Sequence, residues 1–277
     1  MNKIEVKVIA EHGNPAAMTA FLARLTQRGA NIKSMNDLEA LMEKPASKKL
    51  VESMVALENH HTIRRFTPIT VAVVGASRRF LAQIRTHSVG LNFVSASLQY
   101  SDYTGKAQFV VPYAVLEATA AGKRVRCRNS DGTYGRATPT AMYLRGCAED
   151  MKDYAELAEV AGNDAAGYKA PQGLRNILII QGNHDAWLNL IKIRGCNRNT
   201  VETQYVVLRI WEELLKTQDG PEMFKFAGPD CVFGPCKEGK MCCGKPFRST
   251  QELVSTMSST TLPRYIIDTK WPLLKEV

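Results

Sequence analysis

A buried strand that runs directly into a helix constrains the fold of this chain more than any other segment. Residues 66–75 are rich in Thr, Ile and Val, which predicts a buried strand. Residues 77–87 then carry apolar side chains at helical spacing, and Ser77 stands where the N-cap of that helix is expected. The sequence therefore predicts a chain built from both strands and helices.

The remaining segments extend this pattern. Residues 4–10 alternate apolar and charged side chains and predict an edge strand, and residues 14–28 predict a capped helix that ends at Gly29. Trp187 and Trp211 have Leu neighbours at helical spacing and are expected in the core. Further helices are predicted over residues 139–160, 172–181, 185–194 and 200–216. We expect an α/β (α+β) fold with a central sheet and long helices.

Composition divides the chain and limits its partners. Beyond residue 227 the chain becomes rich in Gly, Pro and Cys, so we predict a domain over residues 1–227 and an appendix over residues 228–277. The 36 Lys and Arg exceed the 27 Asp and Glu and give a net charge of +9, which favours anionic partners. Because the cations are spread in pairs without a long basic tail, small anionic ligands are favoured over nucleic acid.

The chain also lacks the signals of export and of membrane insertion. No apolar run approaches the about 20 residues that cross a bilayer. The first residues carry charges where a signal peptide has an apolar region, and the cysteines number seven, an odd count. We therefore expect a cytoplasmic protein with reduced thiols.

Two short segments near the end of the chain contain residue types found in phosphate and metal sites. Residues 234–240 have the spacing of a phosphate loop, but Met241 stands where the magnesium-binding Ser or Thr belongs, so we reject this motif. The spacing of the cysteines beyond residue 230 leaves two interpretations open, a zinc site or a cap of reduced, packed thiols. These cysteines are Cys231, Cys236, Cys242 and Cys243.

A series of polar and cationic residues after the buried strand carries more information. A Ser-Arg pair opens the helix at Ser77, Arg85 and His87 follow, and residues 92–101 read Asn-Phe-Val-Ser-Ala-Ser-Leu-Gln-Tyr-Ser. This order resembles the signature of flavin-dependent thymidylate synthases. In that family an Arg-His-Arg triplet runs into a Ser-x-Arg-Tyr segment that binds flavin and nucleotide.

The resemblance extends on both sides of this stretch, over roughly residues 57–245. Upstream, His60 and Thr62 match a His-x-Ser/Thr motif that contacts the flavin in the family. Downstream, Asn183 and Asn189 match the family's Asn-x-Arg-x-x-x-Asn flavin site, and Arg194 falls where its catalytic arginine sits. Several motifs in the right order make this likeness specific.

The resemblance implies a role for each matched residue. Arg194 is assigned to pyrimidine activation, because an arginine stays charged and can stabilise the negative charge that forms as N3 loses its proton. The residues implied to bind the flavin are His60, Thr62, Arg85, His87, Asn183 and Asn189. The residues implied to bind the nucleotide are Gln83, Ser97 and Gln99, together with Arg194.

The resemblance also implies a reaction and its partners. It implies FAD as cofactor, NADPH and methylenetetrahydrofolate as co-substrates, and transfer of a one-carbon unit to C5 of dUMP. It implies a homotetramer with sites built between subunits. No catalytic cysteine is needed for this chemistry, so the cysteines can be structural, and none of the implied site residues is a metal ligand.

Four departures from the family pattern limit this assignment. The triplet is reduced to Arg85 and His87, Gln99 replaces an arginine, Gly167 aligns with a nucleotide-binding arginine, and Asp185 replaces the arginine of the flavin site. These changes leave two alternatives open, a related flavin enzyme that makes another pyrimidine such as a hydroxymethyl base, and a non-catalytic relative that binds nucleotide or nucleic acid. Candidates to replace the lost cations are Arg78, Lys169, Arg175 and Arg198. His184, although a general base by type, is expected at the surface or in a cap.

Overall fold

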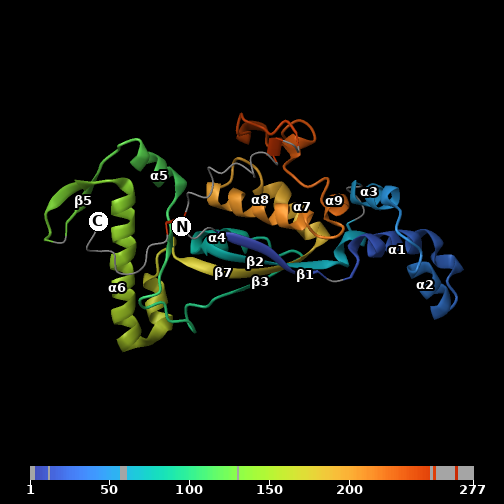
Figure 1. The fold of residues 1–277 in the computed structure, drawn as a ribbon, viewed down its shortest axis with the longest axis horizontal. Coiled ribbons are helices and arrows are strands. Elements are labelled where there is room, and N and C mark those ends of the chain that lie inside the picture. Colours follow the sequence, from blue (N-terminus) through green and yellow to red (C-terminus); the bar gives the residue numbers. More distant parts are fainter. Residues whose placement is uncertain are drawn as a thin grey trace.

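The computed structural model describes residues 4–11, 13–56, 61–129, 131–249, 252–253 and 266–267, and centres on a four-stranded antiparallel sheet of order β1-β2-β7-β3 (Figure 1). The strands are β1 (Glu5–Glu11), β2 (Pro68–Ser77), β3 (Leu91–Ser95), β4 (Phe109–Val110), β5 (Val125–Arg128), β6 (Tyr134–Ala137), β7 (Arg175–Asn183) and β8 (Ile266–Ile267). The α-helices are α1 (Pro15–Arg28), α2 (Met35–Met42), α3 (Lys48–Ala56), α4 (Arg78–Ile84), α5 (Tyr113–Ala120), α6 (Pro139–Ala166), α7 (His184–Arg194), α8 (Val201–Leu215) and α9 (Gly220–Met223). Short 3-10 helices are η1 (Gly29–Asn31), η2 (Ile63–Arg65), η3 (Gly167–Lys169), η4 (Asp230–Val232) and η5 (Gly239–Met241).

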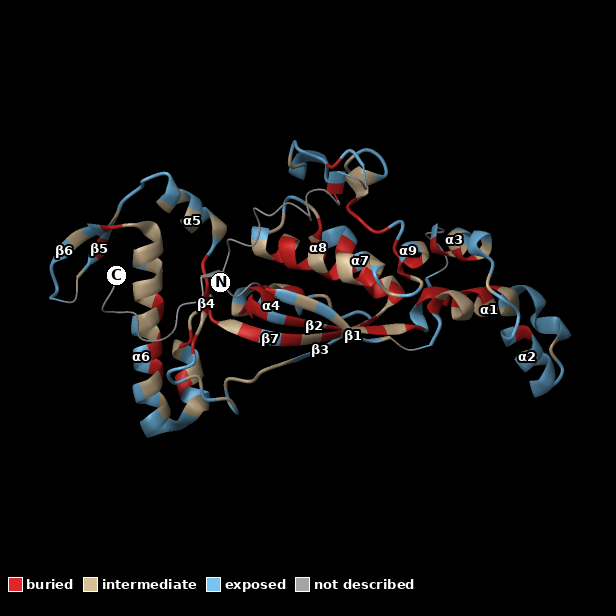
Figure 2. Ribbon diagram, viewed as in Figure 1, coloured by how far each residue is buried: buried red, intermediate tan, exposed pale blue. Residues whose placement is uncertain are grey.

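One face of the sheet is buried beneath α4, α7 and α8 (Figures 1 and 2). Val71 and Val73 of β2 and Leu178 and Ile180 of β7 alternate with exposed or partly exposed neighbours and lie in the main core. Trp187 and Trp211 pack on the same core, with exposed fractions of 0% and 1%, as their helical spacing predicts. Burying these side chains is the dominant stabilising contribution to this layer.

The predicted strands and helices are confirmed, except for one. Residues 172–181 were expected to form a helix, and this prediction is wrong, because residues 175–183 form the central strand β7. The run from Ile177 to Ile180 is three-quarters β-branched, a composition suited to a strand. Only the fold reveals that β2 and β3 flank this segment and bond to both its edges.

A glycine bulge shapes β2 where it approaches α4. The pairing of β2 with β7 shifts between Val74 and Ala76, and Gly75 lies between them with φ +90°. A Cβ at Gly75 would stand 2.3 Å from Nη2 of Arg175, whose Nε donates to the Gly75 carbonyl at 3.3 Å. The bulge redirects the end of β2 and aims Ser77 at the start of α4.

The opposite face of the sheet carries apolar side chains that the described part of the chain leaves exposed. Val74 is 37% exposed, Ile177 is 48% exposed and Val94 is 70% exposed. These residues share one face, because Val74 pairs with Ile177 and Val94 pairs with Ile179 in the register. A contiguous exposed apolar sheet face is typical of a surface that meets another protein.

A second, smaller core lies beside the sheet. The long helix α6 packs with α5 and the β5–β6 hairpin in an arm that projects from one end of the sheet (Figure 1). Met151 and Tyr154 of α6 are buried there with Leu174, which directly precedes β7. Residues 129–133 connect the two strands of the β5–β6 hairpin, and residue 130 is outside the described part of the chain.

The segment after α9 returns to the main core. Phe247 is 5% exposed and Leu253 is 0% exposed, and both belong to the main core cluster. The division of the chain at residue 227 stays a prediction. None of the helices in the described part of the chain is both long and apolar enough to cross a membrane.

Substitution of Ser77 by alanine is expected to destabilise the fold by about 2 kcal/mol. The Ser77 hydroxyl accepts from the amide of Phe80 and donates to the Glu202 carboxylate at 2.6 Å, so it both caps α4 and ties it to α8. Urea unfolding of Ser77→Ala measures the loss. Ser77→Thr is the control, because it keeps the hydroxyl and should cost less than half as much.

Candidate functional site

A cleft of about 920 Å³ opens along the first half of α7. Its other walls come from the end of α3, from η2, from the turn before β3 and from residues 226–237. Asn183 and Asn189, both predicted to bind flavin, line this cleft. A cleft of this size accepts a ligand as large as a cofactor.

Asn183 is held at the mouth of α7 as its N-cap. Its Oδ1 accepts from the amide of Ala186 at 2.9 Å. Gly90 passes over this cap with φ +75°, and a Cβ there would lie 3.1 Å from Nδ2 of Asn183. The glycine therefore lets the chain approach the start of α7 closely enough to form one edge of the cleft.

Asp185 is the centre of a charged cluster on the cleft wall. Its Oδ1 lies 2.7 Å from Nδ1 of His61 and 3.1 Å from Nη2 of Arg64, and its Oδ2 lies 3.6 Å from Nε of Arg65. Nη2 of Arg64 also lies 3.1 Å from Nδ1 of His61. Since the guanidinium can only donate and Nδ1 must keep its proton to donate to the carboxylate, we interpret Asp185 as the shared acceptor.

Arg64 places a guanidinium beside the position where the family pattern has an arginine. The Arg64 side chain is 6% exposed, and its Nη1 donates to the carbonyl of Val55 at 3.0 Å. The loss of an arginine at position 185 is therefore accompanied by a guanidinium supplied from η2. Arg64 was not among the four cations that the sequence suggested as replacements. The reversed charge at Asp185 was the signal that could have pointed to a cationic partner.

Arg194 lies at the other end of α7, outside the cleft lining. Its Nε donates to Nε2 of His87 at 2.7 Å, its Nη1 donates to Oδ1 of Asn199 at 3.0 Å, and its Nη2 donates to Oγ1 of Thr86 at 3.1 Å. Arg194 is about 7 Å farther along the helix axis than Asn189 and is turned by roughly 140° from it. The structure thus joins Arg194 to His87, which the sequence assigned separately, and adds Thr86 and Asn199, which it missed.

His87 is held as a neutral acceptor in this network. Burial, followed by the neighbouring Arg194 cation, lowers the pKa of His87 from its ordinary value. A neutral ring with its proton on Nδ1 leaves Nε2 free to accept from Arg194. The network therefore fixes the direction of the guanidinium near neutral pH and weakens in acid.

The remaining predicted residues around α4 have polar partners in this structure. Oε1 of Gln83 accepts from Oγ1 of Thr200 at 2.9 Å and also from the hydroxyl of Thr203, which ties α4 to α8. Nη2 of Arg85 donates to Oγ of Ser95 at 2.6 Å, and the residue is exposed. These contacts position the end of α4 next to β3.

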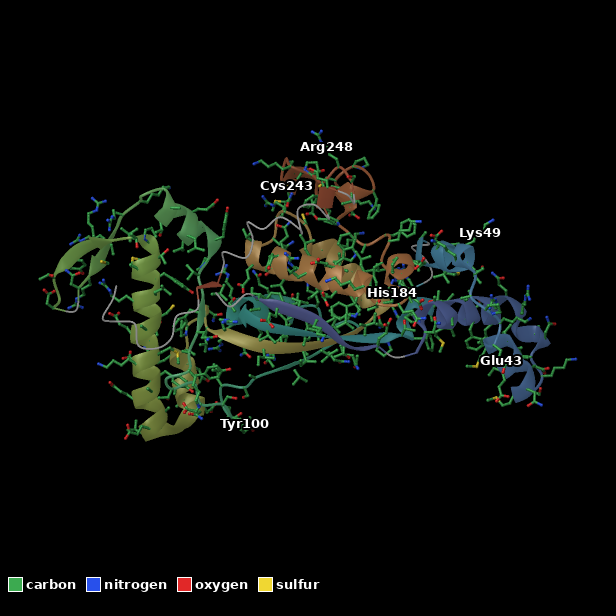
Figure 3. All side chains as sticks on the ribbon, viewed as in Figure 1. Glu43, Lys49, Tyr100, His184, Cys243 and Arg248 are labelled. Carbon is green, nitrogen blue, oxygen red and sulfur yellow. The ribbon has the colours of Figure 1, made fainter. Side chains whose placement is uncertain are left out.

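The loop with Ser97 and Gln99 lies apart from the cleft. Figure 3 shows Tyr100, the next residue, on one side of the sheet and Cys243, in the segment that continues from the cleft wall, on the other. Oγ of Ser97 accepts from the amide of Gln99 at 3.1 Å, and the Gln99 side chain is exposed. Within the described part of one chain, Ser97 and Gln99, which were predicted to bind the nucleotide, therefore do not join the residues that line the cleft.

Arg78 reaches the position where the family pattern has a nucleotide-binding arginine. Its Nη1 lies 3.4 Å from the carbonyl of Gly167 and 3.2 Å from the carbonyl of Ala170. Leu98, beside Ser97, would be 3.3 Å from a Cβ at Gly167, so this cation is near the Ser97–Gln99 loop. Burial lowers the pKa of Arg78, which still leaves an arginine charged.

The other three candidate cations are engaged elsewhere. Nζ of Lys169 lies 2.9 Å from Oδ2 of Asp153, Nη1 of Arg175 donates to Oε1 of Gln108 at 2.6 Å, and Nη2 of Arg198 contacts the sulfur of Met241 at 3.8 Å. Of the four cations that the sequence suggested as replacements, Arg78 is the one whose guanidinium lies at a position where the family pattern has an arginine and this chain does not.

The structure describes one of the two residues of the predicted His-x-Thr motif. Thr62 is the exposed residue before η2, and its side chain does not cap that turn, whereas His60 lies outside the described residues. The seven cysteines are free thiols. Within the residues that the structure describes, no group of three or more His, Cys, Asp or Glu side chains is arranged to hold a metal ion.

His184 was expected at the surface or in a cap, and this prediction is wrong. The residue is 1% exposed, and its Nε2 bonds to the carbonyl of Met223, while Asn183 forms the cap instead. Figure 3 shows His184 inside the fold, at the level of α7 and α9. The first position of α7 faces the core because β7 delivers it there, which the sequence pattern does not reveal.

Burial of His184 predicts a pH-dependent stability. Its pKa is lowered to about 4 from 6.5, chiefly by burial, so the unfolded chain binds a proton between these values that the folded chain does not. The stabilisation is fully present above about pH 6.5 and falls as the pH drops towards 4, by up to about 3 kcal/mol. Urea unfolding at several pH values across this range measures the free energy of unfolding. We expect this free energy to fall less steeply with decreasing pH for His184→Gln than for the parent protein, and an equal fall in both contradicts the prediction.

Comparison with known proteins identifies the chain. The model of the family described as thymidylate synthase complementing protein matches residues 7–218. A flavin-dependent thymidylate synthase of Clostridium tetani is 26% identical over 246 residues, which cover 87% of this chain and 94% of that protein. One of Geobacter sulfurreducens is 23% identical over 245 residues, with the same coverage of 87% and 94%.

Solved structures share the fold. Thymidylate synthase X from Helicobacter pylori, crystallised with FAD and dUMP, has a TM-score of 0.55 and 16% identity, and the match covers 83% of this chain and 100% of that one. A UMP/dUMP methylase, PolB from Streptomyces cacaoi, bound with 5-Br dUMP, has a TM-score of 0.61 and 14% identity, with 82% and 97% covered. The predicted fold class is therefore confirmed.

These findings define an enzyme of the flavin-dependent thymidylate synthase class. Because the family match spans well over half of its length, the chain belongs to the thymidylate synthase complementing protein family. The resemblance seen in the sequence is confirmed.

Proposed function

We propose that this enzyme transfers a one-carbon unit from methylenetetrahydrofolate to C5 of dUMP, with FAD as cofactor and NADPH as reductant. The observation that carries the proposal is the pair Asn183 and Asn189 on one cleft wall, on the same helix that ends at Arg194. These positions match three parts of the family's flavin and pyrimidine site. The relative from Helicobacter pylori was crystallised with FAD and dUMP, which supports the choice of ligands.

The residues of the cleft fit a flavin. The volume of about 920 Å³ is within the range of cofactor sites, and exposed phenylalanines share the cleft with Asn189 and the cations of η2. FAD held there, once reduced by NADPH, would supply the reducing equivalents of the reaction. Asn183 and Asn189 would bind its ring system, and the cluster around Asp185 would support the cleft wall.

Arg194 acts on the pyrimidine. A fixed guanidinium beside N3 and the adjacent carbonyl favours the form of the ring that has lost the N3 proton, and so raises the nucleophilicity of C5. His87, Thr86 and Asn199 hold the guanidinium in one orientation before the substrate arrives. Such prior positioning avoids an entropic cost when the nucleotide binds.

The active site is proposed to be complete only in a homotetramer. Ser97 and Gln99 do not line the cleft, and Tyr100, which follows them, lies across the sheet from Cys243 (Figure 3). The exposed apolar face of Val74, Ile177 and Val94 provides a surface for a second copy. In this arrangement the nucleotide loop of one subunit completes the cleft of another. A cytoplasmic location accords with the substrates.

The experiment is incubation of the purified protein with dUMP, methylenetetrahydrofolate, FAD and NADPH, with the products identified by mass spectrometry. Thymidylate is the expected product, and parallel reactions without NADPH or without the folate should give none. A colourless protein that refuses added FAD, or one that binds FAD and makes no thymidylate, overturns the proposal.

A second candidate is a related enzyme that modifies another pyrimidine nucleotide. Gln99 and Gly167 favour it, because they replace arginines of the family's nucleotide site by an amide and by no side chain. An amide both donates and accepts, so it can read a different base edge. Reactions with UMP and dCMP test this candidate, and a methyl or hydroxymethyl product from either one, with none from dUMP, supports it.

A further inference from the structure

One wall of the cleft comes from a part of the chain that the family match does not include. The match ends at residue 218, whereas residues 226–237 line the cleft together with α7. Asp230 of this segment pairs with Lys192 of α7, with 2.9 Å between Oδ1 and Nζ. This ion pair fastens the wall to the helix that carries Asn189.

Two phenylalanines of this wall line the cleft and are partly exposed. Phe226 is 38% exposed and Phe233 is 51% exposed, and their ring centroids are 6.5 Å apart with 51° between the planes. Gly228, with φ +139°, lies between them in the chain, and a Cβ there would meet the Phe233 ring at 3.5 Å. Tilted aromatic rings exposed on a cleft wall are suited to pack against a flat conjugated ligand.

A cation completes the wall. Lys237 lines the same cleft and is exposed. His61, Arg64 and Arg65 share Asp185, and Lys192 pairs with Asp230, but Lys237 has no acidic partner among the residues that the structure describes. A lysine in this position can bind an anionic group at short range.

We propose that Phe226, Phe233 and Lys237 form a subsite for a planar conjugated ring that carries an anionic group. The inference rests on the proposed function, which supplies two ligands of this chemistry, the flavin nucleotide and the folate. The rings pack against the phenylalanines, and the phosphate or carboxylate contacts Lys237. The pyrimidine nucleotide has a smaller ring and is not the ligand of this subsite.

Direct binding measurements test the subsite without reference to turnover. FAD, 5-formyltetrahydrofolate and dUMP are titrated separately into the full-length protein and into Phe233→Leu, Phe233→Ala and Lys237→Ala. We expect a loss of affinity of about tenfold for FAD or for the folate in the Phe233 and Lys237 variants. The affinity for dUMP should stay within about twofold. The ligand that is weakened identifies which of the two occupies the subsite.

The controls separate the two levels of the argument. Tyr134→Ala removes an aromatic ring that is 62% exposed on the β5–β6 hairpin and does not line the cleft, and it should bind all three ligands like the parent protein. If the parent binds FAD and folate and the Phe233 and Lys237 variants bind both equally well, the subsite is refuted and the proposed function stands. If the parent binds neither, both fall. Phe233→Leu keeps an apolar side chain, so a folding defect in Phe233→Ala does not block the test.

Discussion

Arg194→Ala is expected to lower kcat/KM for thymidylate formation by at least about 100-fold while the protein still binds FAD. The proposed role of Arg194 is to stabilise charge on the pyrimidine, and alanine removes that cation. The cleft residues Asn183 and Asn189 are untouched, so the flavin site should remain. Turnover with dUMP and the visible spectrum of bound flavin are the two measurements.

The same side chain also joins α7 to the end of α4, so a structural role must be separated from a catalytic one. Asn199→Ala removes the hydrogen bond from Nη1 of Arg194, together with those that Nδ2 of Asn199 donates to two backbone carbonyls, and leaves the guanidinium in place. We expect a smaller loss, about tenfold, for this positioning residue. Arg194→Ala that turns over like the parent protein refutes the assignment, and equal losses in both variants with a lowered Tm indicate a structural joint instead.

Arg64→Met is expected to destabilise the protein by about 3–5 kcal/mol. The Arg64 side chain is 6% exposed and bonds both to Asp185 and to the carbonyl of Val55, so its removal leaves a carboxylate that is 18% exposed with a weaker set of partners. Breaking a buried ion pair costs far more than breaking an exposed one, because the remaining charge has lost its solvation. The free energy of unfolding in urea measures the effect.

Its neighbour in the chain provides a matched control. Arg65 also faces Asp185, but its side chain is 55% exposed and its Nε is 3.6 Å away. Arg65→Met should cost less than about 1 kcal/mol, as expected for an exposed pair. Similar losses for the two variants would show that burial does not decide the strength of this cluster.

Local pattern was sufficient for most of the elements. Asn14, Ser77 and the apolar spacing after each of them place α1 and α4 where the sequence predicts them. The helix prediction for residues 172–181 was wrong because a short apolar run is compatible with either a helix or a strand. The two strands that flank it, β2 and β3, lie elsewhere in the chain. The prediction that His184 lies at the surface or in a cap was wrong for a related reason, since the path of β7 sets which side of α7 is buried.

The candidate site was anticipated in its residue types more than in its grouping. Asn183 and Asn189 share a cleft, and Arg194 and His87 share a hydrogen bond, but the structure keeps these two groups apart within one chain. The ion pair of Arg64 with Asp185 joins residues that are 121 positions apart in the chain. No local spacing encodes such a contact.

By itself the sequence determined the family, the alternation of strands and helices, and the chemical types of the candidate site residues, because caps, periodicity and ordered motifs depend on near neighbours. The tertiary structure decided which of those residues meet. It made β7 the central strand, buried His184, set Arg64 against Asp185 and brought residues 226–237 to the cleft. The physical reason is that burial and ion pairing depend on distances through space, which only the packed fold fixes.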